Sequence, residues 1–257
     1  MSPIAPAAAK TDAFHAGLAA AVKAMGGPDF APALASALEA LAPFQMMNGF
    51  AYAPDGRAFD LYNEKIAARR AIIVDRYLAG AFLLDPFYDA IRADAAERLI
   101  VMRRLAPDDF RGTEYYRQHY AETRIVDEIG FVMQLERGFV AVLSLSRTGV
   151  APLFSDAEID CFSGVAPLVS AIAGCHWLSL PASLLPADES RPVPRIEHPL
   201  LTKRELEIVT LILKGHSNLS LAAVLSVSPN TVKVHRRQLY SKLKISSQAE
   251  LFALFLS

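Results

Sequence analysis

The segment from residue 201 to residue 252 constrains this chain more than any other part, because it is a closely spaced series of helix starts and stops. Four residues that can cap the first turn of a helix precede apolar stretches: Thr202, Ser217, Ser228 and Ser247. Glu205 and Glu250 follow two of these caps at the spacing of a capping box. Gly215 ends the first helix, and residues 226–228 form a short turn between the second and third helices. The pattern predicts an all-α unit of four helices that contains a helix-turn-helix.

The third predicted helix has two chemically different faces. At about 100° per residue, an apolar face is formed by Val232, Leu239 and Leu243. The opposite face and its flanks carry Asn230, Lys233, Val234, Arg237, Gln238 and Ser241. Arg and Lys can form paired hydrogen bonds with guanine O6 and N7, and Val can contact a thymine methyl group. We therefore expect the first face to pack in the core and the second to enter the major groove of DNA.

This segment resembles the DNA-binding domain of LuxR-type transcription regulators. The matching residues span nearly all of the last sixty positions: Leu201, Thr202, Arg204, Glu205, Gly215, Ser217, Asn218, Ala222, Leu225, Ser228, Thr231, Val232, Lys233, His235, Lys242 and Leu243. In such regulators, the positions that face base edges match Lys233, Val234 and Arg237. The positions that lie near phosphates match Thr231, Arg236 and Lys242, and the last helix often pairs two subunits. The candidate DNA-binding residues are therefore Asn230, Thr231, Lys233, Val234, Arg236, Arg237, Ser241 and Lys242.

The second predicted helix differs from the usual family pattern at two positions. Family members usually have an acidic residue followed by Ile where this chain has Ser220-Leu221. Ser220 therefore weakens the acid-bearing cap of that helix, but it lies away from the face that would read DNA. We expect the second helix to bury Leu221, Val224 and Leu225.

Charge divides the chain near the same place. From residue 200 onward there are eight Lys or Arg and three Asp or Glu residues, a net charge of +5. The whole chain carries −1 at pH 7, so residues 1–199 carry −6. A basic end attracts phosphates, whereas an acidic body adds no nonspecific affinity for DNA.

Length and composition indicate two globular domains. A chain of 257 residues with 53% hydrophobic and 21% charged residues has room for one sizeable core besides the C-terminal helices. Five prolines concentrate in residues 181–199, a composition typical of an extended linker. We therefore expect a domain for ligand sensing and dimerisation at residues 11–180, a linker at 181–199 and the helix-turn-helix domain at 200–257.

The body alternates predicted helices and strands. Helices are expected at residues 11–24, 29–41, 64–80, 85–94, 108–122 and 155–177, the last one starting at a capping box of Ser155 and Glu158. Strands are expected at residues 44–52, 57–62, 99–105, 130–136 and 139–147. The fold class is therefore α+β, with a mainly antiparallel sheet of about five strands flanked by helices, followed by the all-α domain.

This element order resembles sensor domains of the PAS or GAF kind and the autoinducer-binding domains of quorum-sensing LuxR regulators. The resemblance implies that the body senses a small molecule. Asp85 matches the carboxylate that accepts a hydrogen bond from the amide of an acyl-homoserine lactone in these receptors. However, Tyr77 stands one residue out of register with the family's tyrosine, and the pocket tryptophans are missing, since Trp177 is the sole tryptophan. The ligand is therefore not expected to be an acyl-homoserine lactone.

The candidate ligand-binding residues are Tyr77, Asp85, Tyr115, Tyr116 and His119. Each also has a purely structural interpretation. Asp85-Pro86 is a common helix start, with Asp as the cap and Pro at the first position, and we favour that role for Asp85. The aromatic residues from 115 to 119 either line a polar pocket or, as such residues do more often, cover a sheet.

Other functional classes lack their motifs in this sequence. No GxSxG, P-loop or GxGxxG pattern occurs, and the six His and two Cys show no metal-ligand spacing. Cys161 and Cys175 lie four turns apart on one predicted helix, so they cannot bridge each other there, and we expect both to be reduced and buried. No signal peptide pattern and no apolar stretch of ~18 residues occurs. We expect a cytoplasmic protein with no membrane partner, catalytic site, metal site or cofactor.

Two functions remain open. The first is a ligand-responsive transcription regulator that binds an inverted repeat in double-stranded DNA as a homodimer. The second is a DNA-binding regulator whose body is a protein-interaction and dimerisation module without a small-molecule ligand. RNA polymerase is a further candidate partner. A sealed pocket with convergent polar groups in the body would favour the first, and a filled core with an exposed apolar patch would favour the second.

Overall fold

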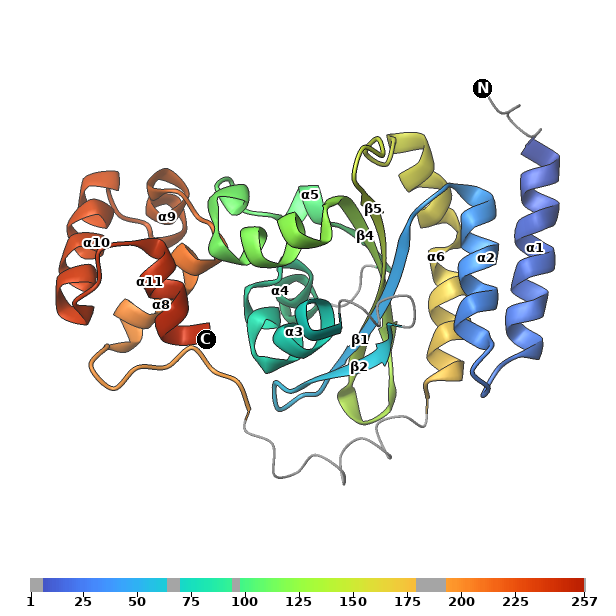
Figure 1. The fold of residues 1–257 in the computed structure, drawn as a ribbon, viewed down its shortest axis with the longest axis horizontal. Helices are drawn as coiled ribbons and strands as arrows, with labels where there is room; N and C mark the ends of the chain where they lie inside the picture. Colours follow the sequence, from blue (N-terminus) through green and yellow to red (C-terminus); the bar gives the residue numbers. More distant parts are fainter. Residues whose placement is uncertain (1–6, 64–69, 94–97, 179–192, 257) are drawn as a thin grey trace. The chain divides into compact units, whose positions relative to one another are not determined.

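The computed structural model describes residues 7–63, 70–93, 98–178 and 193–256 (Figure 1). The chain divides into two compact units, each built from separate stretches of sequence. Unit 1 comprises Met1–Lys65, Asp94–Val101 and Ile125–Pro192, and unit 2 comprises Ile66–Ala93, Met102–Arg124 and Val193–Ser257. The predicted linker at residues 181–199 lies largely outside the described residues.

Five antiparallel strands form the sheet of unit 1: β1 (Met46–Tyr52), β2 (Ala58–Tyr62), β3 (Leu99–Val101), β4 (Ile125–Gln134) and β5 (Val140–Thr148). Their order in the sheet is β2-β1-β5-β4-β3. The longest pairing joins β4 to β5, from Ile125 opposite Thr148 to Gln134 opposite Val140. The predicted antiparallel sheet of five strands is confirmed.

Helix α6 (Asp156–His176) packs on the sheet, α2 (Phe30–Leu41) contacts α6, and α1 (Ala7–Lys23) packs against α2 (Figure 1). Gly17 allows the close approach of α1, because a Cβ at this position would lie 2.8 Å from Ala37 Cα. The core between the helices and the sheet contains several fully buried rings: Phe30, Phe131, Phe139, Phe154 and Phe162.

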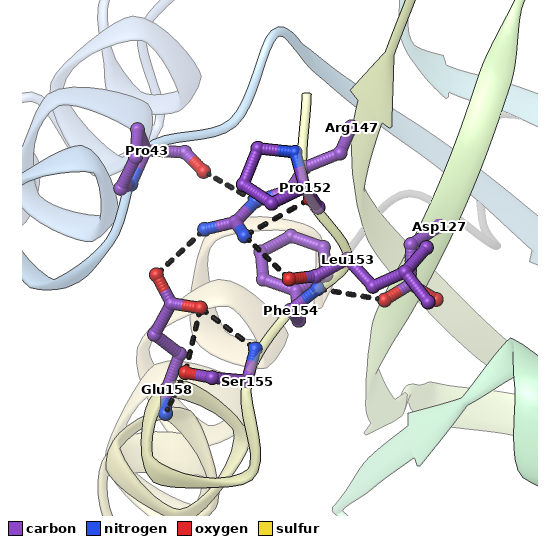
Figure 2. Close-up of polar contacts among 8 residues, drawn as sticks. All are labelled: Pro43, Asp127, Arg147, Pro152, Leu153, Phe154, Ser155 and Glu158. Atoms are coloured by element: carbon purple, nitrogen blue, oxygen red, sulfur yellow. Dashed lines mark hydrogen bonds and ion pairs between the residues drawn. The ribbon is translucent and has the colours of Figure 1, made fainter. Parts of the chain in front are cut away.

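A buried arginine fastens the start of α6 to the sheet (Figure 2). Arg147, at the end of β5, is 2% exposed. Its guanidinium donates hydrogen bonds of 2.9–3.2 Å to three carbonyl oxygens, those of Pro43, Pro152 and Leu153. It also pairs with Glu158 Oε1 at 2.7 Å. The other oxygen of Glu158 accepts from Ser155 N at 2.8 Å, which completes the predicted capping box of α6.

Unit 2 is helical. Its first part consists of short elements: a π turn at Ala71–Asp75, α3 (Arg76–Ala79), a 3-10 turn at Ala81–Leu84, α4 (Pro86–Ala93), α5 (Met102–Leu105), a 3-10 turn at Phe110–Gly112 and a π turn at Tyr116–Ala121. Its second part consists of α8 (Lys203–Lys214), α9 (Asn218–Leu225), α10 (Pro229–Leu243) and α11 (Gln248–Leu256). The four predicted C-terminal helices are confirmed.

Two predicted strands have different bounds in the structure. The strand expected at residues 99–105 ends at Val101, and α5 follows, because one helical turn lets both Arg103 and Arg104 reach solvent. The strand expected from residue 130 begins at Ile125. Its first half includes two buried acids with partners: Asp127 accepts from Phe154 N at 2.9 Å (Figure 2), and Glu128 accepts from Ser146 Oγ at 3.1 Å.

The helix predicted at residues 108–122 is interrupted. Thr113 Oγ1 accepts a hydrogen bond from Tyr116 N at 3.0 Å and starts a new helical stretch, so a 3-10 turn precedes it and a π turn follows. The helix predicted at residues 64–80 falls partly outside the described residues. Its described part is a π turn followed by α3.

Three side chains predicted to be buried are exposed. Cys161 and Cys175 both lie on α6 as free thiols, but α6 turns them to the surface and buries its opposite side, which includes Phe162 and Val169. Val224 is 53% exposed, since α9 buries Leu221 and its neighbours instead. Among the described residues, α6 is long and apolar enough to cross a membrane, and 39% of its most apolar stretch is buried inside the fold.

Candidate nucleic-acid interface

The caps of the C-terminal helices have the predicted geometry. Thr202 Oγ1 accepts from Glu205 N at 3.3 Å, and Thr202 N donates to Glu205 Oε2 at 2.8 Å, which completes a capping box. Gly215 ends α8 in the left-handed region with a φ of 97°. Ser217 and Ser228 accept from the first turns of α9 and α10 at 3.2 and 3.0 Å. These bonds determine where α10 begins and therefore which residues share each of its faces.

Helix α10 buries Val232 and Leu239 and exposes its other side. Seven of the candidate DNA-binding residues are exposed: Asn230, Thr231, Lys233, Val234, Arg237, Ser241 and Lys242. Val234 is 42% exposed although it is aliphatic. An exposed Val among cationic residues is the arrangement expected of a helix that reads base edges.

Two candidate phosphate contacts are already engaged within the domain. Arg236 is half-buried, and its Nη1 donates to Asn218 Oδ1 at 3.0 Å. Lys242 Nζ donates to both carboxylate oxygens of Glu205, at 2.8 and 2.9 Å. These cations tie α9 and α8 to α10. Sequence reasoning missed Asn218 and the second role of Glu205, because their partners lie 18 and 37 residues away.

The cap of α8 is electrostatically strong. The hydrogen bond from Lys242, together with the bonds from Thr202, lowers the pKa of Glu205 from 4.5 to about 2. The carboxylate therefore stays ionised at any physiological pH, and it holds the last turn of α10 against the first turn of α8.

Tyr77 and Asp85, two candidate ligand residues, are bonded to each other in unit 2. Tyr77 Oη donates to Asp85 Oδ2 at 2.7 Å, and both side chains are buried. Asp85 Oδ1 accepts from Phe87 N at 2.8 Å. Asp85 therefore caps α4, which is the structural role that its sequence context favours, and its second oxygen holds Tyr77.

The candidate ligand residues with rings lie in one aromatic cluster, together with Phe110 and Tyr120. His119 stacks on Tyr115, with a centroid distance of 5.5 Å and an interplanar angle of 6°, and lies 5.6 Å from the ring of Tyr77. Tyr116 stacks on Tyr120 at 5.6 Å and 5°. Burial, with a smaller effect of Arg76, lowers the pKa of His119 from 6.5 to about 4, so this imidazole is neutral at pH 7. The structure brings the five predicted residues together in one region of unit 2.

The described residues contain no group of three or more His, Cys, Asp or Glu side chains arranged to hold a metal ion. Two candidate surfaces are present in unit 2: a cationic face of α10 and an aromatic cluster with a buried hydroxyl–carboxylate pair.

Residues 199–255 match the family model of bacterial regulatory proteins of the luxR family. The C-terminal domain is a LuxR-type DNA-binding domain. A protein of Aeromonas salmonicida named as an HTH-type transcriptional regulator in the exeN 3′ region is 29% identical over 184 residues, which cover 67% of this chain and 93% of that protein. The resemblance inferred from the sequence is thus confirmed.

Solved LuxR-type proteins share the fold upstream of this domain. The LBD domain of VqsR from Pseudomonas aeruginosa aligns with a TM-score of 0.55 and 25% identity, over 64% of this chain and 96% of that one. CepR2 of Burkholderia cenocepacia, an N-acylhomoserine lactone dependent LuxR family transcription factor, aligns with a TM-score of 0.50 and 16% identity, over 67% of this chain and 97% of that one. A LuxR-type DNA-binding domain thus follows a region with the fold of a ligand-binding domain, the architecture of a LuxR-family transcription regulator.

Proposed function

We propose that this protein is a sequence-specific transcription regulator that binds an inverted-repeat operator as a homodimer and responds to a small molecule. The exposed cationic face of α10 carries the DNA-binding half of the proposal. Lys233, Val234 and Arg237 contact base edges, while Asn230, Thr231, Arg236, Ser241 and Lys242 contact the backbone or flank the reading residues. The proposed function is non-enzymatic and cytoplasmic, since double-stranded DNA is the principal partner. RNA polymerase is a further partner at the promoter.

The exposed face of α6 supports a homodimer. Exposed residues recur on it every three or four positions: Ala157, Cys161, Gly164, Leu168, Ala171 and Cys175. This spacing is typical of a helix–helix seam. No Asp, Glu, Lys or Arg lies between Asp160 and His176, so a charged partner would find nothing to pair with. A helix that lies on a membrane would carry Lys or Arg on its polar face, which α6 lacks. A second copy of α6 is the partner of matching chemistry.

The aromatic cluster supports a small-molecule ligand of a class other than acyl-homoserine lactones. One carboxylate oxygen of Asp85 caps α4 and the other accepts a hydrogen bond from Tyr77, so Asp85 is poorly placed to bind a ligand amide. Trp177, the sole tryptophan, packs at the end of α6 against Phe30 and His176. We propose that Tyr77, Tyr115, Tyr116 and His119 bind a ligand with an aromatic or other flat apolar part, because such rings stack on flat surfaces.

Two measurements test these proposals separately. Footprinting on enriched operator sequences should show two protected half-sites related by inversion, and protection of one half-site by a monomer would disprove the homodimer. A thermal-shift screen of metabolites should find a compound that raises the midpoint of unfolding, whereas lactones should give little or no rise. A strong shift with a lactone would refute the ligand class. If no compound shifts the midpoint, the dimerisation-module alternative is favoured.

A further inference from the structure

The cap of α9 lacks an acid of its own. In α8 and α6, Glu205 and Glu158 accept a hydrogen bond from the N–H of the capping residue. In α9 the capping residue Ser217 accepts from Ser220 N, but Ser220 has no carboxylate to return to the Ser217 N–H. That N–H donates instead to Asp108 Oδ1, at 2.9 Å and 109 positions away in the sequence. The acceptor that this capping box lacks is therefore supplied by a residue outside the DNA-binding domain.

The residues after Asp108 contact the α8–α9 junction as well. Asp109 N donates to Gly215 O at 2.8 Å. Gly215 is buried, and a Cβ there would lie 2.7 Å from both Phe110 Cα and Thr113 Cγ2. Gly215 therefore meets two requirements that only glycine satisfies together, a positive φ at the end of α8 and close backbone approach.

An ion pair and a cavity lie near this contact. Lys214 Nζ lies 2.5 Å from Asp89 Oδ1, and its side chain is 17% exposed. A cavity of about 280 Å³ adjoins the pair, and its lining includes Asp89, Lys214 and His216. The polar bonds from residues 108 and 109 and the close approach at Gly215 thus lie near this ion pair and cavity.

We propose that residues 108–113 are an intramolecular docking site for the DNA-binding domain, and that Asp108 is a positioning residue that supplies the missing acid of the α9 cap. The proposal deepens the proposed function by naming the surface against which the DNA reader is held. It rests on the assignment of α9 to that reader and is independent of any ligand.

Hydrogen exchange in the full-length protein tests the cap. Asp108→Ala should speed exchange of the amides from Ser217 to Ser220 by about fivefold, as expected for loss of one capping bond. Asp109→Ala is the matched control, because it removes the same charge but keeps the backbone bond from residue 109 to Gly215. Equal exchange in wild type and Asp108→Ala, or an equal increase in both variants, would overturn the proposal.

A second substitution separates the cap from a general loss of stability. Ser220→Glu places an acid at the capping-box position within α9 itself. In that background Asp108→Ala should leave exchange of the α9 amides unchanged, because the Ser217 N–H has a carboxylate nearby. Ser220→Ala controls for the lost bond between Ser220 Oγ and His216 Nδ1. If Asp108→Ala has its full effect in the Ser220→Glu background, the capping role is wrong.

Gly215→Asn tests the close approach. Asn tolerates a positive φ, so the substitution should weaken the contact with residues 108–113 through its Cβ, which meets the backbone of Phe110. Peptides covering residues 106–114 and 213–221 should both exchange faster. Gly149→Asn has a φ of 70° and open space around it, so it should change neither peptide. Operator binding by the wild type is measured separately: its absence would count against the proposed function and would leave these exchange results intact.

Discussion

The residues proposed to read DNA and the residues that hold α10 in place differ in the effect expected from their replacement. Arg237→Ala and Lys233→Ala should each weaken operator binding by about 1–3 kcal/mol and relax the preference at one base pair, because both side chains lie on the free face. Arg236→Ala should weaken all sequences more evenly. Lys203→Ala removes an exposed charge outside α10 and serves as the control. Binding titrations on operators with single base changes decide the matter, and unaltered specificity in both reading variants would refute the assignment.

Arg147 is a buried cation that joins β5 to the start of α6 in unit 1. Arg147→Met should lower the free energy of unfolding by about 3–5 kcal/mol, because Glu158 Oε1 and three carbonyl oxygens lose the hydrogen bonds that Arg147 donates. Arg117→Met removes a more exposed pair with Glu114 and one hydrogen bond to Gly112 O, and should cost less than about 1 kcal/mol. Denaturant unfolding of both variants measures the difference. Similar losses would mean that the Arg147 network adds little to stability.

At the scale of elements, sequence reasoning succeeded where the signal is local. The capping boxes of α6 and α8 and the glycine stop at Gly215 are set by residues within one turn, so the helix bounds follow from them. It failed where the partner is distant. Pro43 and Arg147 are 104 positions apart, and Asp108 and Ser217 are 109 apart, so neither contact leaves a pattern in the sequence. The helix predicted at 108–122 is not continuous, because the Thr113 hydroxyl accepts the hydrogen bond of a backbone N–H, that of Tyr116.

The exposed seam of α6 gives a prediction at the same scale. Leu168→Asp should shift the protein from dimer toward monomer, because two carboxylates would face an apolar surface at the centre of the seam. Val150 is fully exposed and lies outside α6, so Val150→Asp should leave the assembly unchanged. Sedimentation equilibrium reports both. Since Cys161 and Cys175 flank Leu168 at equal spacing, cross-linking between thiols distinguishes two arrangements: an antiparallel pair joins 161 to 175, and a parallel pair joins like positions.

For the whole molecule, stability should fall with acidity in two steps. The pKa of His119 is about 4 in the folded protein against 6.5 ordinarily, so its contribution is complete above pH 6.5 and is lost as pH falls toward 4. The pKa of Glu205 is about 2 against 4.5, and that of Glu158 is also lowered, because hydrogen bonds outweigh burial. Their contributions are lost below pH 4.5. Burial also lowers the pKa of His176 and His216, so His119→Gln should reduce the first step without removing it, and should leave the second step unchanged, when unfolding is followed from pH 8 to pH 3. A first step unchanged in that variant would assign it to other groups.

The aromatic cluster and the docking site share one residue, which makes a coupling between ligand and DNA reader testable. The Phe110 ring lies 5.4–6.0 Å from the rings of Tyr115, Tyr116 and Tyr120, while its backbone meets Gly215. A compound found by thermal shift that binds among these rings should change exchange of the amides at 213–221. It can do so only if it binds the docked and undocked arrangements with different affinity. In Gly215→Asn, where docking is already weakened, the same compound should bind but change that exchange much less. An equal change in both proteins would show that the signal does not pass through residues 108–113.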